Sequence, residues 1–369
     1  MLVCKNPSQS GGFPTLWIHT GAGPQIGFGH LKRCLILARE ICDFARVFFI
    51  LRPDDQWSGS LIEAQGHEYQ NTDFSGLQCD HSHCPSAILI DTRVSDGVDA
   101  FIRTARKNNV PVLSLHDMGL NPLYSDIAVD GSIIGTSRRD LPARKIFSGA
   151  AYMVLDPAYS SLRRESLRIE KEIRSIFISL GGGNAQKYFL RVLDGLRLWA
   201  KGIEREIEVV GMSGFVDWGQ DAFNEENLRP LRFRWESGSA AGFLRKSDLA
   251  VTAGGISAYE ALCTGTPLLA LSWDSFQQAA VDRMAESGCC VNLGAGDDLA
   301  PEFLARLLEK LDGDVSAREK TARIGMEIVD GRGAGRVAAI IRRVIRRRTS
   351  IKPANPMKPA NYRIPRKTR

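Results

Sequence analysis

Residues 16–42, LWIHTGAGPQIGFGHLKRCLILAREIC, contain the pattern that decides the fold. The apolar run Leu16–Gly21 predicts a buried β-strand, and a glycine-rich loop follows it. The next stretch, His30–Ile41, has the apolar spacing of an amphipathic helix. A strand, a glycine turn and a helix in this order are typical of βαβ units, in which helices alternate with the strands of a parallel sheet.

The same alternation continues along most of the 369 residues, a length that suits two domains. The other predicted strands are Arg46–Leu51, Ala87–Asp91, Val110–His116, Asp126–Val129, Ser175–Leu180, Glu206–Val210, Leu231–Trp235, Leu249–Thr252, Pro267–Ser272 and Cys290–Leu293. The other predicted helices are Asp96–Lys107, Gln186–Ala200, Ser257–Cys263, Phe276–Glu286, Pro301–Leu311 and Gly335–Arg347. A break at Gly149–Glu172, with Pro157 and many charged residues, indicates a linker.

This pattern predicts an α/β fold of two Rossmann-like, doubly wound parallel-sheet domains. We expect an N-terminal domain at 15–150, a linker at 151–173, a C-terminal domain at 174–348 and a basic tail at 349–369. In such sheets ligands bind beyond the carboxyl ends of the strands. Two α/β halves joined by a linker therefore predict a ligand cleft between them.

Composition excludes several classes of protein. The sequence shows neither a membrane-spanning apolar stretch nor a signal peptide, and the eight cysteines are scattered, so we expect a cytoplasmic protein without a disulfide framework. The net charge of +6 comes from the tail, which has six Lys and Arg and no acid. A neutral body with a basic, proline-rich end is not typical of a nucleic-acid enzyme. The tail and Arg342–Arg348 fit either a solvated end or a peripheral contact with anionic lipid.

The first candidate site is Gly27-Phe28-Gly29-His30, where the first predicted helix begins. A helix N-terminus offers N–H groups and a partial positive charge to an anion. His30 can act there as a general base near neutral pH, and Arg33 adds a cation one turn later. The alternative is that His30 only caps the helix or packs against it.

Two further glycine turns follow strands of the second half. Gly181-Gly182-Gly183-Asn184 fits a loop through which a diphosphate approaches the main chain, and a flexible turn is the alternative. In Gly254-Gly255-Ile256-Ser257 the turn opens a helix whose amides can hold phosphate oxygens. Glu260, one turn later, is a candidate acceptor for both ribose hydroxyls. Its alternative is a capping box with Ser257, because the S-x-x-E spacing fits one.

Polar residues also follow the strand that ends at Ser272. Gln277 and Gln278 are candidates to orient a sugar or a pyrophosphate, or are ordinary residues of a helix start. The segment Cys79–Cys84 contains four potential zinc ligands within six residues. Structural zinc sites usually bring ligand pairs from separated segments, so we expect a surface loop here and no metal.

Taken in order, these motifs resemble the nucleotide-sugar hydrolases of pseudaminic acid biosynthesis, relatives of spore-coat polysaccharide proteins and of the murein UDP-GlcNAc transferase. The resemblance spans residues 16–345 and implies the GT-B architecture, in which a cleft separates two Rossmann-like domains. The matching pieces are GxGHxxR at 27–33, the glycines at 181–183, TAGGxSxYE at 252–260, Gln278, the segment LDPAYSSLRRE at 155–165, and Ser125-Asp126-Ile127 following Asp117.

This resemblance implies that His30 is the catalytic histidine and that Gly254, Gly255, Ser257 and Glu260 form the uridine diphosphate pocket. The implied reaction is hydrolysis of a UDP-linked 2,4-diacetamido-2,4,6-trideoxy sugar by water, with inversion and without a metal or cofactor. A GT-B glycosyltransferase that uses a UDP-amino sugar and a non-catalytic binder of nucleotide sugars are the alternatives, since fold does not fix function.

Three segments depart from the family pattern. Thr92-Arg93 stands where the family has His-Tyr, Gln277 where it has asparagine, and Gly183-Asn184 where it has Ser-Asp. These changes lie in the sugar-facing part more than in the nucleotide-facing part. Arg93 is a candidate ligand for an acidic sugar or a diphosphate, or a partner of Asp96 in a surface ion pair.

Overall fold

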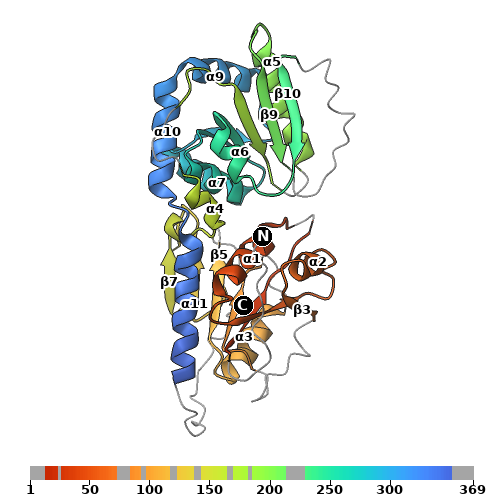
Figure 1. Cartoon of the computed structure of the whole chain (residues 1–369), viewed down its shortest axis with the longest axis vertical. Coiled ribbons are helices and arrows are strands. Elements are labelled where there is room, and N and C mark those ends of the chain that lie inside the picture. Colours follow the sequence, from red (N-terminus) through yellow and green to blue (C-terminus); the bar gives the residue numbers. More distant parts are fainter. Residues whose placement is uncertain are drawn as a thin grey trace, which may run out of the picture.

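Two parallel β-sheets, one in each half of the chain, form the framework of the protein (Figure 1). The computed structural model describes residues 13–23, 26–72, 84–92, 97–116, 123–136, 143–163, 169–181, 185–212 and 229–350. The first sheet has the order β3-β2-β1-β4-β5-β6-β7 and the second β10-β9-β8-β11-β12-β13. All of the pairings between neighbouring strands are parallel.

The strands confirm the predicted alternation and add two edge strands, β3 and β7, that the sequence analysis missed. The first sheet contains β1 (Thr15–His19), β2 (Arg46–Leu51), β3 (Glu68–Asn71), β4 (Ala87–Ile90), β5 (Val112–His116), β6 (Ile127–Asp130) and β7 (Lys145–Ser148). The second contains β8 (Ser175–Ser179), β9 (Ile207–Met212), β10 (Leu231–Glu236), β11 (Leu249–Ala253), β12 (Leu268–Ser272) and β13 (Val291–Ala295).

Helices cover the faces of both sheets. In the first half they are α1 (Gly29–Ile41), α2 (Ser58–Glu63), α3 (Val98–Lys107) and the short η1 (Ala150–Tyr152). They continue with α4 (Pro157–Ser161), α5 (Gln186–Ala200), α6 (Ala241–Lys246), α7 (Ile256–Thr264), α8 (Ser275–Glu286), α9 (Pro301–Gly313), α10 (Val315–Ile328) and α11 (Gly333–Ser350). Because both faces of a parallel sheet are covered, central strands such as β4 and β11 are buried along their whole length.

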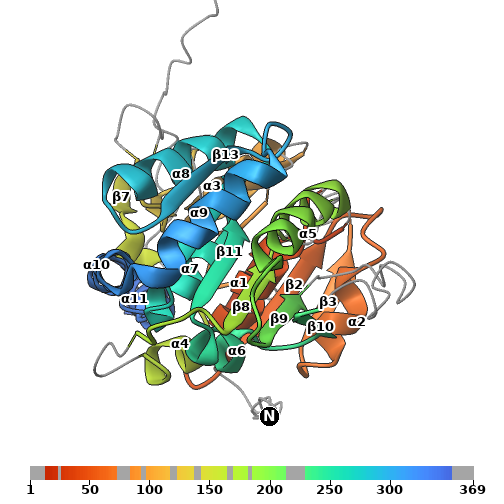
Figure 2. The same cartoon turned by 90° about the horizontal axis from the view of Figure 1, so that it is seen from above.

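The second sheet is packed between two groups of helices (Figure 2). One face carries α5 and α9, whose leucines share a core with Ile176 and Val251 of the sheet. The other face carries α6, α7 and α8 around Phe177 and Ala250. Neighbouring residues of one strand thus enter different cores, as the alternation of side chains along a strand requires.

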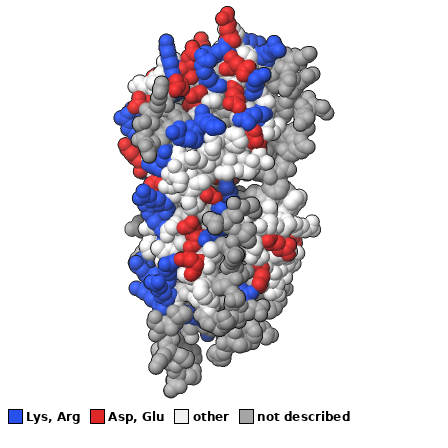
Figure 3. All heavy atoms as spheres, in the orientation of Figure 1, with Lys and Arg blue, Asp and Glu red and all other residues white. Residues whose placement is uncertain are grey.

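The C-terminal helix α11 returns from the second domain to the first. Its buried residues Val337 and Ile341 belong to the same core as Leu37 of α1 and Phe49 of β2. The sequence analysis assigned this helix to the second domain, but the structure places it on the first. The apolar period of a helix shows which face is buried and not which sheet covers it. The outer side of the first domain along α11 is rich in Lys and Arg (Figure 3).

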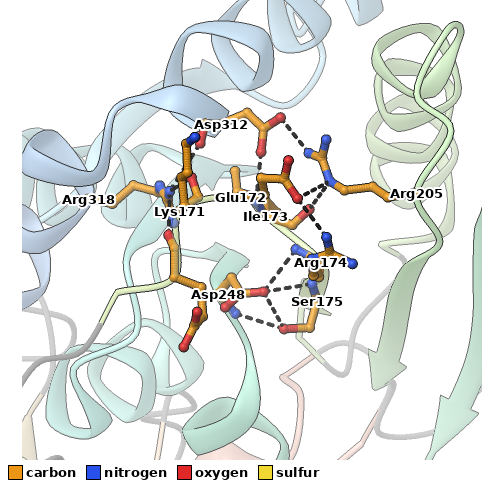
Figure 4. Close-up of polar contacts among 10 residues, drawn as sticks. Lys171, Glu172, Ile173, Arg174, Ser175, Arg205, Asp248, Asp312 and Arg318 are labelled. Carbon is orange, nitrogen blue, oxygen red and sulfur yellow. Dashed lines mark hydrogen bonds and ion pairs between the residues drawn. The ribbon is translucent and has the colours of Figure 1, made fainter.

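The segment that leads into β8 is fastened to the second domain by three buried or half-buried side chains (Figure 4). The bonds join Arg318 to the carbonyl oxygens of Glu170 and Lys171, Asp312 to the N–H of Ile173, and Asp248 to the N–H groups of Arg174 and Ser175. The end of the predicted linker is therefore held by the second domain. A charged side chain that is buried in this way needs such partners, because an unpaired one is costly.

Among the described residues, no helix is long and apolar enough to cross a membrane. The cytoplasmic location that we expect from the sequence stays a prediction.

Substitution by alanine should have opposite effects on stability at two glycines near the start of α11. A Cβ on Gly333 would lie 2.0 Å from the carbonyl oxygen of Met153, whereas a Cβ on Gly335 meets only Glu40 Oε2 at 4.0 Å. We expect Gly333→Ala to destabilise the protein by about 1–3 kcal/mol through overpacking. Gly335→Ala should stabilise it by roughly 1 kcal/mol, because alanine favours the helix. Denaturant unfolding measures both, and a stable Gly333→Ala variant would contradict this packing of α11.

Candidate active site

The candidate site lies where each sheet reverses its strand order. In the first sheet β1 pairs with β2 on one side and β4 on the other, and in the second β8 pairs with β9 and β11. Connections leave in opposite directions at such a switch point, which opens a crevice beyond the carboxyl ends of the strands. The motifs that follow β1, β4, β8 and β11 therefore belong to two crevices.

His30 lies near the switch point of the first sheet, inside a buried cluster of charged groups. Its Nδ1 is 2.7 Å from Oδ1 of Asp91, the residue that follows β4. Arg33 donates to both carboxylate oxygens of Asp91, from Nε at 3.0 Å and from a terminal nitrogen at 2.7 Å. His30, Arg33 and Asp91 are respectively 6%, 3% and 0% exposed. His30 is therefore held in place by a carboxylate, and the structure does not support a role as a simple helix cap.

Asp91 is an anion in this cluster. Burial by itself raises the pKa of its carboxyl, but the positive charges of Arg33 and His30 and their hydrogen bonds bring that pKa down to about 2. Arg33 also has a terminal nitrogen 3.0 Å from Nδ1 of His30, so Nδ1 faces both a carboxylate and a guanidinium. With its proton on Nδ1, a neutral His30 donates to the ionised Asp91, and Nε2 carries the lone pair that a general base needs. The Asp91 carboxylate also stabilises the imidazolium form of this ring.

The glycine loop before α1 brings the first domain close to the second. Gly27 has φ +74° and exchanges two main-chain hydrogen bonds with Gly23. A Cβ on Gly29 would lie 3.1 Å from Cδ1 of Ile256, the first residue of α7 in the second domain. The absence of a side chain at Gly29 thus lets the two helix N-termini approach each other, whereas a Cβ on Gly27 would meet nothing within 4 Å.

The start of α7 lies at the switch point of the second sheet, directly after β11. A Cβ on Gly254 would lie 2.7 Å from Val281 Cγ2 and 2.9 Å from the carbonyl oxygen of Gln277, so only glycine fits there. Gly255 is the N-cap of α7, and no side chain caps this end. The first N–H groups of an uncapped helix form a site for phosphate oxygens. Gly181, which follows β8, has φ +96° and lies at the same switch point.

Glu260 projects from α7 towards the first domain. Its Oε1 is 2.6 Å from Nζ of Lys32 in α1, and the Glu260 side chain is only 3% exposed, against 44% for Lys32. The capping-box alternative does not hold, because α7 already begins at Ile256 and Ser257 lies inside it. The Ser257 hydroxyl is instead 3.2 Å from the hydroxyl of Ser179, at the end of β8.

Gln277 and Gln278 hold the turn between β12 and α8. The N–H of Gln277 donates to Asp274 at 2.7 Å, and its side-chain oxygen accepts from the N–H of Trp273. The Gln278 amide accepts from the hydroxyl of Ser272 and donates to Asp282. These bonds give both glutamines a structural role, and a contact of either one with a sugar stays a prediction.

Several predicted residues lie outside the described part of the chain. They are Arg93, Gly182, Asn184, residues 79–83 of the segment with four potential zinc ligands, and the tail beyond residue 350. Within the described ranges, no group of three or more His, Cys, Asp or Glu residues is placed to hold a metal ion.

The sequence analysis did not name Asp91 or Lys32 as site residues. Asp91 carried a usable signal, because it follows the buried strand AILI at the edge where ligands bind. Lys32 carried none, since its partner Glu260 is 228 positions away in the sequence.

Comparisons with known proteins support the fold that this geometry describes. No known protein-family model matches the chain. It is 26% identical over 339 residues to the spore coat polysaccharide biosynthesis protein SpsG of Bacillus subtilis, an alignment that covers 88% of this chain and 96% of SpsG.

Two solved structures share the architecture at low identity. MurG of Acinetobacter baumannii aligns with a TM-score of 0.62 and 12% identity over 89% of this chain and 99% of MurG. Arabidopsis thaliana UGT89C1, solved in complex with UDP, aligns with a TM-score of 0.60 and 14% identity over 89% and 99%. The predicted GT-B architecture of two Rossmann-like domains is thus confirmed.

The buried cluster makes a prediction about stability. Asp91→Asn removes the charged partner of the buried Arg33 and the carboxylate that His30 contacts, so we expect it to lower the free energy of unfolding by about 3–5 kcal/mol. Asp54→Asn, at an exposed carboxylate, should change it by no more than about 0.5 kcal/mol. Because the native pKa of Asp91 is depressed to about 2, its contribution is complete above pH about 4 and is lost as the pH falls towards 2. Equal, small effects of both substitutions in urea unfolding would contradict the cluster.

Proposed function

We propose that this chain, a relative of SpsG with the GT-B fold, is an enzyme of polysaccharide biosynthesis that binds a UDP-amino sugar between its domains. The observation that carries the proposal is the His30–Asp91 pair in one crevice, opposite the uncapped N-terminus of α7 in the other. A base in the first domain can take a proton from the nucleophile. An anion site in the second domain can bind the diphosphate of the leaving group.

In this proposal the second domain holds the nucleotide. The amides at the start of α7 bind the diphosphate, because a Cβ on Gly255 would face open space and Gly255 therefore leaves them accessible. Glu260 accepts hydrogen bonds from the ribose hydroxyls in exchange for its bond to Lys32. Lys32, released from Glu260, is a long and partly exposed cation that can then reach the diphosphate. The UDP complex of UGT89C1, a protein with the same fold, supports a nucleotide in this cleft.

His30 supplies the chemistry on the other side. Its Nε2 takes the proton of the attacking hydroxyl group while the oxygen forms a bond to the anomeric carbon. The bond from that carbon to the phosphate oxygen breaks, and UDP leaves with the electron pair. Asp91 stabilises the imidazolium, and Arg33 keeps Asp91 ionised. Attack from the face opposite UDP inverts the anomeric centre.

The nucleophile separates two candidate functions. We favour transfer to an acceptor hydroxyl, because MurG and UGT89C1 share the fold and SpsG is named for polysaccharide biosynthesis. This choice departs from the hydrolase expected from the motifs. Hydrolysis by water remains the second candidate, since GxGHxxR and TAGGxSxYE resemble the hydrolases of pseudaminic acid biosynthesis.

A UDP-release assay tests the proposal with a panel of UDP-amino sugars, with and without glycan or lipid-linked acceptors. We expect release that depends on an acceptor and falls about 10²–10⁴-fold in His30→Ala, the usual contribution of acid–base catalysis. UDP affinity, measured by calorimetry, should hardly change in that variant.

Three other outcomes of this assay are informative. Many turnovers without any acceptor would assign the hydrolase instead. Near-normal rates in His30→Ala would remove the histidine from the mechanism. UDP binding without release under any condition would leave a nucleotide-sugar binder with no catalytic activity.

A further inference from the structure

The charge of this chain is divided sharply at residue 331. Residues 331–369 carry 13 of the 48 Lys and Arg and none of the 42 Asp and Glu. The preceding 330 residues, with 35 basic and 42 acidic side chains, therefore have a net charge of −7. Seven of the 13 cations are arginines of α11 or of the turn before it. Such a separation of charge indicates an interaction surface and not general solubility.

Some of these arginines hold α11 to the body of the protein. Arg336 pairs with Asp330 and donates to the carbonyl oxygen of Ala151 at 2.8 Å. Arg342 pairs with Asp43 and lies over the ring of Phe44, 4.3 Å from its centre. Arg348 donates to the carbonyl oxygen of Pro85. The guanidinium groups of these three arginines therefore interact with other groups of the protein.

Three further arginines, all in α11, form an outward row. Arg343, Arg346 and Arg347 are exposed, and their spacing of three and four residues puts them on one face of the helix. The same face continues towards the start of α11 through exposed Ala339 and Gly335, which are too small to keep a flat surface away. Figure 3 shows the Lys and Arg side chains gathered on this side of the first domain. The sequence beyond residue 350 adds six more Lys and Arg.

We propose that the outward row of α11, Arg343, Arg346 and Arg347, is a docking surface for an anionic lipid bilayer. A bilayer is flat, and α11 presents its cations along one straight helix of 18 residues, roughly 27 Å long. A nucleic acid that wrapped further round the protein would meet residues 1–330, whose net charge is −7, whereas a bilayer touches this side only. The surface lies on the domain that carries His30, so docking holds the base side of the cleft near the membrane.

The expected loss of vesicle binding follows from the contribution of each cation to membrane affinity. Each Lys or Arg near an anionic surface contributes about 1 kcal/mol, equivalent to about a fivefold change in partitioning. Loss of three such residues should therefore weaken binding by about a hundredfold. The attraction is electrostatic, so added salt should weaken it as well.

The test is co-sedimentation of the full chain with vesicles of phosphatidylcholine alone or mixed with phosphatidylglycerol. We expect binding only to the mixed vesicles, strong at about 0.1 M salt and weak at about 0.5 M. The variant Arg343→Gln/Arg346→Gln/Arg347→Gln should lose most of it. A matched variant, Arg306→Gln/Lys310→Gln/Lys320→Gln, removes three exposed cations from α9 and α10 of the second domain and should bind as the original protein does.

The proposal would be wrong if the protein did not bind the mixed vesicles. It would also be wrong if the α11 variant still bound them, or if both variants lost binding equally. Tighter binding of duplex DNA or RNA than of mixed vesicles at the same salt would assign a nucleic-acid surface instead. The measurement needs no substrate, so its failure is independent of any failure of the proposed catalytic function. Circular dichroism of both variants ensures that a loss of binding is not a loss of folding.

Discussion

A carboxylate buried between two domains is the constraint on which the candidate site depends. Glu260 belongs to the second domain, its side chain is 3% exposed, and the cation 2.6 Å away belongs to the first. A buried charge without a partner costs several kcal/mol, so the carboxylate needs either Lys32 or other hydrogen-bond donors. Ribose hydroxyls can be such donors. In this account, the ribose hydroxyls therefore replace Lys32 as the partner of Glu260 when a nucleotide binds. The ion pair that joins the two domains is then broken.

The order of elements in the chain brings the switch points of the two sheets close together. Each sheet places a glycine turn and a helix start at its switch point, and the two helices α1 and α7 meet where Gly29 lies against Ile256. α11 then crosses back and packs on α1, so the chain passes between the domains twice. His30 is held by Asp91 of its own domain, and Arg33 in turn holds Asp91. The base that we propose is thus fixed within the first domain, while the proposed anion site belongs to the second.

Much of this architecture could be predicted because its signals are local. The apolar strands before Gly21, Gly181 and Gly254 and the helices after them follow from short patterns in the sequence. The edge strands β3 and β7 were missed because half-exposed strands such as EYQN and KIFS lack an apolar run. The pair of Lys32 with Glu260 and the placement of α11 on the first domain depend on contacts between distant parts of the chain. No local pattern encodes these contacts.

The central claim is that Glu260 receives the nucleotide, and calorimetric titration with UDP tests it most directly. Glu260→Gln keeps the size of the side chain but accepts ribose hydroxyls less well, because a hydrogen bond to a charged group is worth about 1.5–3 kcal/mol. Glu309→Gln changes an exposed glutamate of α9 in the same way and serves as the control. The account predicts UDP affinity that is at least about tenfold weaker in Glu260→Gln and unchanged in Glu309→Gln. Unchanged affinity in both variants would contradict it.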